Sequence, residues 1–423
     1  MSANPSRIVM KFGGTSVADL DRIATVARFV RREVDDGKAV VVTVSAMAGE
    51  TNRLVGLCDA VGAPDPALDA RGVEYDAVVS SGEQVSSGLL ALTLQKAGYR
   101  ARSWQGWQIG LRTDAAHGRA RIRGIDAAEL GEAIDAGEIA VVAGFQGVGP
   151  DGRISTLGRG GSDTSAVALA AAVGAARCDI YTDVDGVYTT DPRLTKSARR
   201  MARLSYEEML EMASLGAKVL QTRSVELAMA HNVPLRVLSS FNDPGDPGPG
   251  TIICDEDEIV EHKIVSAVTL AHDETKISLL SVPDKPGVAA RIFNIVGEAG
   301  VNVDMIVQSP SRTGDAANIS FTMNEGDLAR AEDVLLAAQE ELGYESLKSE
   351  RGVSKVSVIG VGMKSHTGVA STMFRTLAEN NINIHNISTS EIKISVLIDS
   401  KYAELAVRAL HTAYDLDRKI NVA

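Results

Sequence analysis

Residues 8–254 of this 423-residue chain alternate short apolar runs with amphipathic segments, and this alternation most constrains the fold. The apolar runs predict strands at 8–11, 39–45, 139–144, 178–182, 235–238 and 251–254. The amphipathic segments predict helices at 19–35, 82–97, 127–136, 164–173, 205–212 and 216–231. Such alternation is typical of an α/β protein with a mainly parallel sheet between layers of helices.

Four residues close predicted strands of this sheet: Lys11, Ser45, Gly144 and Thr182. In open α/β sheets, ligands bind at the carboxyl ends of the strands. We therefore expect these four residues to line one cleft.

The first strand runs into the turn Lys11-Phe12-Gly13-Gly14-Thr15-Ser16, and a helical segment follows. Glycines let backbone N–H groups approach an anion, the helix adds its positive N-terminal end, and lysine supplies a compact charge. These parts suit phosphate binding, although the lysine precedes the glycines, unlike in a Walker A loop. The alternative is an ordinary turn with a solvated lysine.

A second glycine cluster, with the sequence Thr-Leu-Gly-Arg-Gly-Gly-Ser-Asp-Thr, occupies residues 156–164 and precedes an Ala-rich helical segment. Arg159 offers a planar fork for a carboxylate or a phosphate. Ser162 or Asp163 is expected to cap the helix. The alternative is a plain helix entry in which Arg159 points into water.

Three further features each allow two interpretations. The loop 181–193 carries aspartates, tyrosines and Arg193, so it suits a nucleotide base, ribose and phosphates, or is a polar surface loop. Glu83 opens an apolar helix and either complements the helix dipole or grips a substrate ammonium group. Lys218 lies in an otherwise apolar helix and either contacts a phosphate or extends to solvent.

The region beyond residue 260 contains an internal repeat, because residues 285–303 find an echo 81 positions later, at 366–384. Each copy is preceded by an alternating strand, at 276–282 and 355–361, and followed by another, at 318–322 and 392–398. Two α+β units of about 70 residues explain this pattern, paired with ligand sites in the seam. The turn-rich stretch 243–250 indicates a domain boundary shortly after it, near 260.

The composition excludes several classes of function. The chain has 55 acidic and 43 basic residues, a net charge of −12, which disfavours nonspecific nucleic-acid binding. The three cysteines and seven histidines are scattered, so no metal site of the protein's own is expected. The longest apolar run, 166–176, is far shorter than the roughly 20 residues of a membrane span, and no targeting segment is visible. We therefore expect a cytoplasmic protein without nucleic-acid or membrane partners.

Taken together, these segments resemble the aspartate kinase branch of the amino acid kinase family, across essentially the whole chain. The matching motifs are residues 11–16, 44–47, 81–83, 158–163, 183–188 and 191–193. The repeat is similar to the paired ACT regulatory domains of that family. The resemblance implies an amino acid kinase fold over residues 1–260, followed by two ferredoxin-like α+β ACT domains at 265–347 and 353–423.

The resemblance implies ATP-dependent phosphorylation of the β-carboxylate of L-aspartate, the first step towards lysine, threonine and methionine. A carboxylate acceptor is already ionised at neutral pH, so the reaction needs no general base. Catalysis then depends on stabilising charge on the transferring phosphoryl group. By analogy, Lys11 and the amides of Gly13 and Gly14 supply that charge, and Mg²⁺ is carried by the nucleotide.

The resemblance also assigns binding residues. Arg159 and Thr51 would hold the α-carboxylate of L-aspartate, and Glu83 with Asp163 its ammonium group. Asp163 is also placed among the catalytic residues, and the rest of the substrate site is Gly160, Gly161 and Ser162. The expected ATP site comprises Lys11, Phe12, Gly13, Gly14, Ser45, Thr182, Asp183, Tyr188, Arg193 and Lys218.

For regulation, the family places amino-acid effectors between ACT domains, here threonine, lysine or both. The matching positions in the first copy are Asp284, Asn302, Val303, Asp304 and Gln308. In the second copy they are Val369, Ala370, Asn383, Ile384, Ser390 and Glu391. A homo-oligomer formed through the ACT domains is expected, and an internal start would add a separately translated regulatory subunit.

A second class of function stays open at this point, a nonenzymatic amino-acid sensor on a kinase-like scaffold. The set of charged residues argues against it, because an inactive site has no physical need for buried charges. These residues are Lys11, Glu83, Arg159, Asp163 and Arg193.

Overall fold

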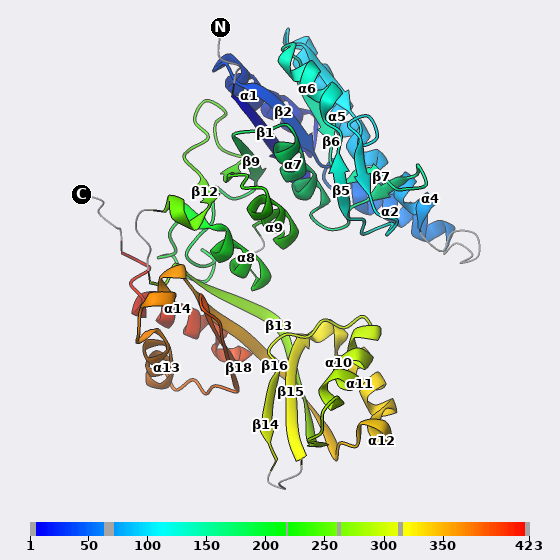
Figure 1. The fold of residues 1–423 in the computed structure, drawn as a ribbon. Coiled ribbons are helices and arrows are strands. Elements are labelled where there is room, and N and C mark those ends of the chain that lie inside the picture. Colours follow the sequence, from blue (N-terminus) through cyan, green and yellow to red (C-terminus); the bar gives the residue numbers. More distant parts are fainter. Residues whose placement is uncertain (1–5, 63–71, 217–218, 260–263, 312–315, 419–423) are drawn as a thin grey trace. The chain divides into compact units, whose positions relative to one another are not determined.

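The structure is a computed structural model that describes residues 6–62, 72–216, 219–259, 264–311 and 316–418. The chain divides into two compact units, whose elements are labelled in Figure 1. The first unit holds most of residues 1–260. The second unit holds the rest of the chain together with two short segments from the first 260 residues, among them Tyr188–Arg199.

The first unit is built on an eight-stranded sheet with the order β10-β12-β11-β9-β1-β2-β6-β3. Every neighbouring pair is parallel except β11 and β12, so the mainly parallel sheet predicted from the alternation is confirmed. The strands are β1 (Arg7–Phe12), β2 (Ala39–Val44), β3 (Ala101–Trp104), β6 (Ile139–Ala143), β9 (Arg177–Thr182), β10 (Arg203–Ser205), β11 (Leu235–Ser239) and β12 (Thr251–Cys254).

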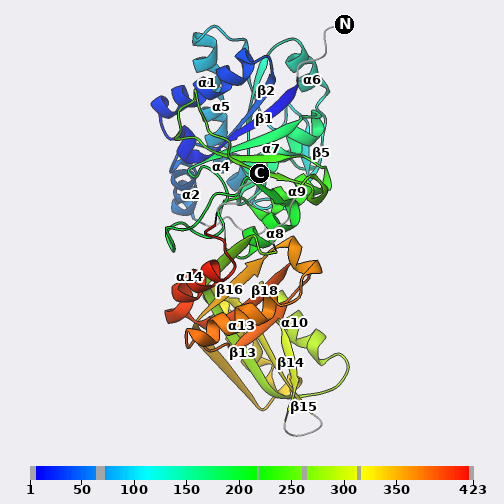
Figure 2. The same cartoon turned by 90° about the vertical axis from the view of Figure 1, so that its left-hand side faces the viewer.

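Helices cover both faces of this sheet (Figures 1 and 2). Met10 of β1 shares a buried cluster with Phe29 of α1 and Leu90 of α5. Because side chains alternate along a strand, Lys11 faces the opposite side, where it meets α7. The helices are α1 (Leu20–Asp35), α2 (Glu50–Val61), α4 (Val73–Val79), α5 (Ser81–Lys96), α6 (Ala128–Asp135), α7 (Gly161–Ala172), α8 (Tyr206–Ser214), α9 (Thr222–Ala230) and the 3₁₀ helix η1 (Gly14–Val17).

Two helices begin elsewhere than the sequence predicts. The expectation that Ser162 or Asp163 caps α7 is wrong, because α7 begins at Gly161 and its N-cap is Gly160 in the left-handed conformation. This backbone conformation costs glycine little, so the helix gains a turn that carries Asp163 on its inner side. The helix predicted at 216–231 is shorter, since α9 begins only at Thr222.

A small four-stranded sheet, absent from the sequence prediction, lies in the same unit with the order β5-β4-β7-β8. Strands of three or four residues are too short to show a clear period in the sequence. The last of them ends at Thr156, directly before the second glycine cluster. The strands are β4 (Leu111–Thr113), β5 (Ile122–Ile125), β7 (Gln146–Val148) and β8 (Ile154–Thr156).

The second unit contains both copies of the repeat on one antiparallel six-stranded sheet, with the order β14-β15-β13-β16-β18-β17. Helices from both copies pack on it (Figure 1). The strands are β13 (Ala267–Pro283), β14 (Val307–Pro310), β15 (Ala316–Asn324), β16 (Ser346–Ile359), β17 (Asn386–Thr389) and β18 (Lys393–Asp399). The helices are α10 (Val288–Glu298), α11 (Leu328–Ala337), α12 (Gln339–Leu342), α13 (Val369–Glu379) and α14 (Ala403–Ala413), with short 3₁₀ turns between elements.

The two central strands of this sheet serve both copies. Val268, near the start of β13, is buried with Val356 and the helices α13 and α14, whereas Leu279 of the same strand is buried with α10 and α11. The register agrees, because Val268 pairs with Val358 and Leu279 pairs with Leu347. The hydrophobic core of the second copy therefore includes the start of the range 265–347 that is predicted for the first copy.

The segment Tyr188–Arg199 belongs to the second unit although it follows β9 of the first. The backbone N–H of Val268 donates to the carbonyl oxygen of Thr189 at 2.8 Å. The Thr189 hydroxyl lies 2.8 Å from Nε2 of the buried His411 on α14. A chain boundary near 260 therefore does not describe the packing of this segment.

No helix in the part of the chain that the structure describes is long and apolar enough to cross a membrane.

Candidate active site

A buried ion pair lies at the carboxyl end of β1. The Nζ atom of Lys11 is 2.5 Å from Oδ1 of Asp163, and their side chains are only 11% and 12% exposed. Lys11 comes from β1 and Asp163 from the first turn of α7. A buried pair of this kind costs desolvation energy, which is typical of a group kept for chemistry.

The glycine turn that follows Lys11 is placed beside its ammonium group. A Cβ atom on Gly13 would lie 3.4 Å from the Lys11 Nζ, and one on Gly14 would lie 3.1 Å from the carbonyl oxygen of Ala46. The Ser45 N–H donates to the Phe12 carbonyl at 3.0 Å. The predicted meeting of the first two strand ends is therefore present, and backbone amides and one ammonium group lie close together there.

Glu83 reaches the same strand end from the first turn of α5. Its Oε1 accepts a hydrogen bond from the Ala46 N–H at 3.0 Å, and its buried Oε2 has no hydrogen-bond partner in the described residues. Burial raises the pKa of Glu83 from 4.5 to about 7. Gly82 allows this approach, because a Cβ there would lie 2.7 Å from the Cβ of Ala46. A buried carboxylate with a free oxygen is suited to bind a cation.

The second glycine cluster turns tightly around Gly160, where a Cβ would lie 2.0 Å from Cγ of Gln221. The buried Ser162 lies beside Gly144 at the end of β6, since a Cβ on Gly144 would be 3.0 Å from the Ser162 Oγ. Arg159 is exposed, and among the described residues no hydrogen bond or ion pair holds it. Its guanidinium is therefore available to an anion.

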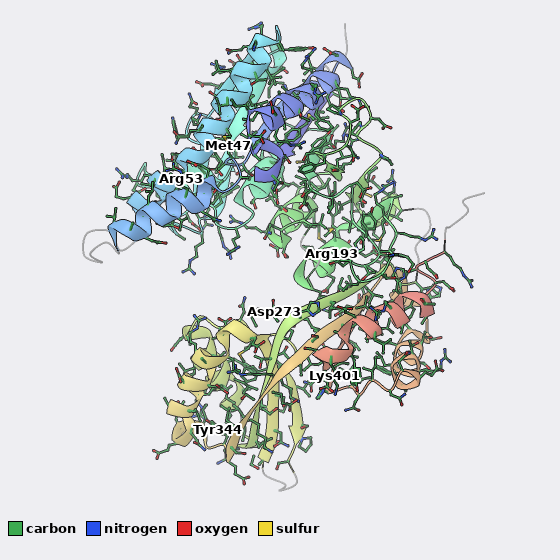
Figure 3. All side chains as sticks on the ribbon, turned by 180° about the vertical axis from the view of Figure 1, so that it is seen from behind. Met47, Arg53, Arg193, Asp273, Tyr344 and Lys401 are labelled. Atoms are coloured by element: carbon green, nitrogen blue, oxygen red, sulfur yellow. The ribbon has the colours of Figure 1, made fainter. Side chains whose placement is uncertain are left out.

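The predicted nucleotide residues are divided between the units. Ser45 and Thr182 lie at strand ends of the first unit, and Asp183 is exposed with its Oδ1 3.2 Å from the Thr182 hydroxyl. Tyr188 and Arg193 belong to the second unit. Arg193, labelled in Figure 3, is 90% exposed on its side chain and forms a fork with Asp191 at 2.6 and 3.0 Å.

Two further predictions concern Thr51 and Lys218. Thr51 is half-buried in the first turn of α2, next to Glu50, whose Cγ would lie 3.5 Å from a Cβ on Gly82. This places Thr51 on the element that packs against the Glu83 region. Lys218 lies outside the described residues.

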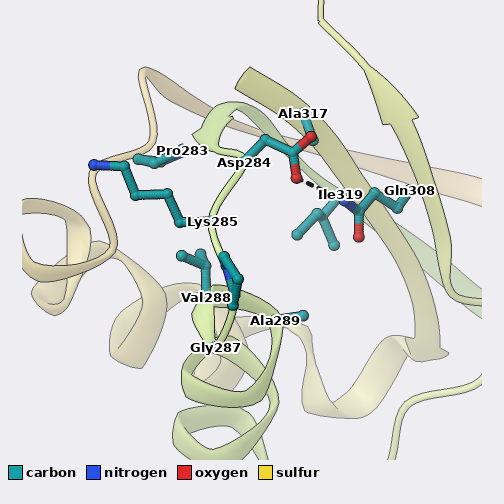
Figure 4. A pocket seen from close by; sticks show the side chains of 10 residues that line it. Pro283, Asp284, Lys285, Gly287, Val288, Ala289, Gln308, Ala317 and Ile319 are labelled. Atoms are coloured by element: carbon teal, nitrogen blue, oxygen red, sulfur yellow. Dashed lines mark hydrogen bonds between the residues drawn. The ribbon is translucent and has the colours of Figure 1, made fainter. Parts of the chain in front are cut away.

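The second unit has a separate cavity of about 370 Å³ in its first copy (Figure 4). The polar side chains that line it are Asp284, Lys285 and Gln308. The Nε2 of Gln308 donates to the Asp284 Oδ1 at 3.4 Å. Of the other predicted effector residues, Asp304 is paired with the buried Lys355, which also lies 2.8 Å from the Glu274 Oε1. In the first copy Asn302 is exposed and Val303 is half-buried. In the second copy Val369 is buried, Ala370 and Ile384 are half-buried, and the exposed residues are Asn383, Ser390 and Glu391.

Sequence reasoning missed a buried carboxylate, Asp76 of α4. It accepts hydrogen bonds from the backbone N–H groups of Gly118 and Thr156 and from the Thr156 hydroxyl, and it lies 2.9 Å from Nδ1 of His117. The only sequence signal is an aspartate at the start of an apolar stretch, Ala77-Val78-Val79. In the described residues, no group of three or more His, Cys, Asp or Glu side chains is arranged to hold a metal ion.

Comparison with known proteins agrees with this architecture. Residues 6–239 match the model of the amino acid kinase family, and residues 277–342 and 356–414 each match a model of the ACT domain. An aspartate kinase from Pseudomonas fluorescens is 51% identical over 411 residues, which cover 97% of this chain and 98% of the relative.

Solved structures of aspartokinase III from E. coli are similar over 96% of this chain. The complex with aspartate and ADP has a TM-score of 0.77 at 28% sequence identity, and the match covers 99% of that structure's chain. The complex with lysine and aspartate has a TM-score of 0.71 at 29% sequence identity, and the match covers 98% of that structure's chain. The predicted fold, an amino acid kinase domain followed by two ACT domains, is confirmed. The chain therefore belongs to the amino acid kinase family, among the aspartate kinases that carry paired ACT domains.

Proposed function

We propose that this protein transfers the γ-phosphoryl group of ATP to the β-carboxylate of L-aspartate, giving 4-phospho-L-aspartate and ADP. The observation that carries the proposal is the Lys11 ammonium beside the Gly13 turn at a strand end, within a chain of this family. Names of relatives and the aspartate and ADP in the E. coli structure support the choice of substrates.

The chemistry asks little of the protein beyond positioning and charge. A β-carboxylate oxygen attacks the γ-phosphorus while the bond to the bridging oxygen of ADP breaks. Since the acceptor has a pKa of about 4, it is ionised without a base. Lys11 and the Gly13 and Gly14 amides would stabilise the negative charge on the phosphoryl oxygens. Asp163 would keep the Lys11 ammonium in place, because their atoms are 2.5 Å apart.

The substrate amino acid would be gripped at both of its charged ends. The free Oε2 of Glu83 suits the ammonium group, with Asp163 as a second carboxylate. The free guanidinium of Arg159, with Thr51, suits the α-carboxylate. Gly160, the N-cap of α7, and the buried Gly161 and Ser162 of its first turn would line the site beside the acceptor. For ATP we propose Phe12, Ser45, Thr182 and Asp183 of the first unit. Tyr188, Arg193 and Lys218 stay predictions drawn from the resemblance.

Mg²⁺ is proposed to enter with the nucleotide. Among the described residues the Lys11 ammonium pairs with the carboxylate of Asp163. We therefore assign this carboxylate to holding ammonium groups and do not propose it as a metal ligand. When bound, the ion would neutralise phosphate charge and orient the leaving group.

Regulation is proposed to act through the second unit. The cavity beside Asp284 and Gln308 is of a size for one amino acid, and Asp284 would hold its ammonium group. Lysine, the ligand named for one E. coli structure, and threonine are both candidates. We also propose a homo-oligomer formed through the ACT sheets, to which a separately translated regulatory subunit could be added.

The proposal is tested by trapping the acyl phosphate as a hydroxamate. Lys11→Ala should lower ATP-dependent hydroxamate formation from L-aspartate by about a hundredfold or more, because charge on the phosphoryl group loses its partner. The exposed Lys96 provides the control, Lys96→Ala, which should behave as the parent.

Near-normal turnover of a folded Lys11→Ala variant would contradict the phosphate role. A parent protein that binds effector amino acids but forms no hydroxamate would instead favour the nonenzymatic sensor. Circular dichroism of each variant shows whether its fold survives.

A further inference from the structure

Asp76 is completely buried, and its two oxygens are saturated with donors. The Thr156 N–H and hydroxyl donate at 2.8 and 2.6 Å, and the Gly118 N–H donates at 3.0 Å to Oδ2. The ring of His117, also buried, lies 2.9 Å from the same Oδ2 through its Nδ1. Hydrogen bonds to an ionised carboxylate are stronger than neutral ones, so this cluster joins its elements tightly.

On one side of the cluster is the loop that carries Arg159. Thr156 ends β8, three residues before Arg159. Its neighbour Leu157 is also fixed, since its N–H donates to the Phe145 carbonyl at 2.9 Å and its own carbonyl accepts from Arg223 at 2.9 Å. The loop entering the second glycine cluster is therefore anchored, and Asp76 supplies its only side-chain acceptor at Thr156 among the described residues.

On the other side is the helix that carries Glu83. Asp76 lies on α4, and Ser80 is both the C-cap of α4 and the N-cap of α5. The Ser80 carbonyl accepts a buried hydrogen bond from the Gln146 side chain at 2.9 Å. The path from Asp76 to Glu83 is thus seven residues of helical backbone with a fixed joint.

We propose that Asp76 is a positioning residue that sets the distance between Glu83 and Arg159, and thereby the length of amino acid that the site accepts. The inference rests on the proposed function, in which these two groups hold the ammonium and the α-carboxylate of L-aspartate. Asp76 itself touches neither the acceptor nor the nucleotide. It determines how well both ends of the substrate are gripped while the β-carboxylate reaches the phosphoryl group.

The first test is Asp76→Asn, which keeps the shape but turns an amide NH₂ towards N–H donors. The KM for L-aspartate should rise by about tenfold or more, while the KM for ATP stays within about twofold of the parent. Discrimination against L-glutamate, measured as a ratio of kcat/KM values, should fall. The matched control is Ser155→Ala, which breaks the buried Thr113–Ser155 hydroxyl pair on the same strand without touching Asp76.

A milder pair of variants decides the matter if Asp76→Asn does not fold. Thr156→Val removes one of the bonds to Asp76 and should raise the KM for L-aspartate by about threefold or more, whereas Thr156→Ser retains the hydroxyl and should restore it. The inference is wrong if Thr156→Val leaves that KM unchanged, or if Ser155→Ala raises it equally. A parent enzyme without aspartate-dependent turnover would contradict the proposed function itself.

Discussion

Glu83 combines two properties that are costly together in a folded protein. Its carboxylate is buried, and only one of its oxygens accepts a hydrogen bond from the described residues. Burial raises its pKa to about 7, so the ionised form destabilises the folded chain. An ammonium group beside Oε2 would offset this cost, and we therefore interpret the free oxygen as a binding group for substrate.

Since Glu83 must be ionised to hold an ammonium group, kcat/KM for L-aspartate should rise as the pH increases through about 7. In Glu83→Gln this rise should disappear, and the KM at pH 8 should increase by about tenfold or more because the amide carries no charge. Hydroxamate assays between pH 6 and pH 8.5 measure both. A pH profile that is identical in the variant would contradict the assignment.

Stability provides the control for this experiment, and its sign is fixed. A raised pKa favours the folded state at low pH, and that contribution is lost as the pH rises towards about 7. At pH 8 the free energy of unfolding of Glu83→Gln should therefore exceed that of the parent by up to roughly 3 kcal/mol. Its melting temperature should be correspondingly higher. Near pH 4 the two proteins should be equally stable.

At the scale of elements, α7 shows how a backbone conformation positions the groups that we propose for catalysis. Gly160 caps the helix at a φ of 67°, and Gly174 follows its other end at a φ of 60°. The two glycines share the left-handed conformation but differ in surroundings. A Cβ on Gly160 would lie 2.0 Å from Gln221, whereas nothing lies within 4 Å of one on Gly174.

The two glycines form a matched pair of substitutions. Gly174→Ala should lower the free energy of unfolding by about 1 kcal/mol and leave kcat/KM unchanged, because only the backbone conformation is penalised. Gly160→Ala should cost more stability and lower kcat/KM by about a hundredfold, because α7 must shift and carry Asp163 with it. Chemical denaturation and steady-state kinetics distinguish the two. Equal kinetic effects would contradict this account.

The sequence predicted the elements that carry the site better than it predicted their contacts. Lys11 and Thr182 stand at strand ends and Glu83 in a first helical turn, and such places are visible from periodicity. Asp76 was missed because a lone aspartate in a helix resembles a surface residue until its partners, 41 and 80 positions away, are known. The cap of α7 was misplaced for a similar reason, since the space around Gly160 is set by a distant side chain.

At the scale of the whole molecule, the two regulatory copies share their central strands. The repeat revealed that two copies exist, because each keeps its own pattern of apolar positions. It could not reveal which half of β13 belongs to which core, because the register between β13 and β16 depends on pairs that are far apart in the sequence, from Leu280 with Ser346 to Ala267 with Ile359. The hydrophobic cores therefore cut across the range 265–347 that we predict for the first copy, because Val268 packs with α13 and α14.

This division predicts that two substitutions on one strand destabilise different helices. Val268→Ala should weaken the core of the second copy and raise hydrogen exchange in α13 and α14, although Val268 lies in the range predicted for the first copy. Leu279→Ala should raise exchange in α10 and α11 instead. Each truncation should lower the local opening free energy by about 2 kcal/mol or more. Exchange that rises in the same helices for both variants would contradict the assignment of cores.

The arrangement of β13 also bears on the order in which the chain is completed during synthesis. In the sequence, the strands of the first copy lie between the start of β13 and the other strands of the second copy. The first copy is therefore synthesised completely before β17 and β18 of the second copy. The opening residues of β13 must stay without their partner strand until β16 has been made. A regulatory fragment translated from an internal start would contain the complete core of the second copy only if it began before Val265, which belongs to that core. Starts at Met201, Met209 and Met212 all satisfy this condition.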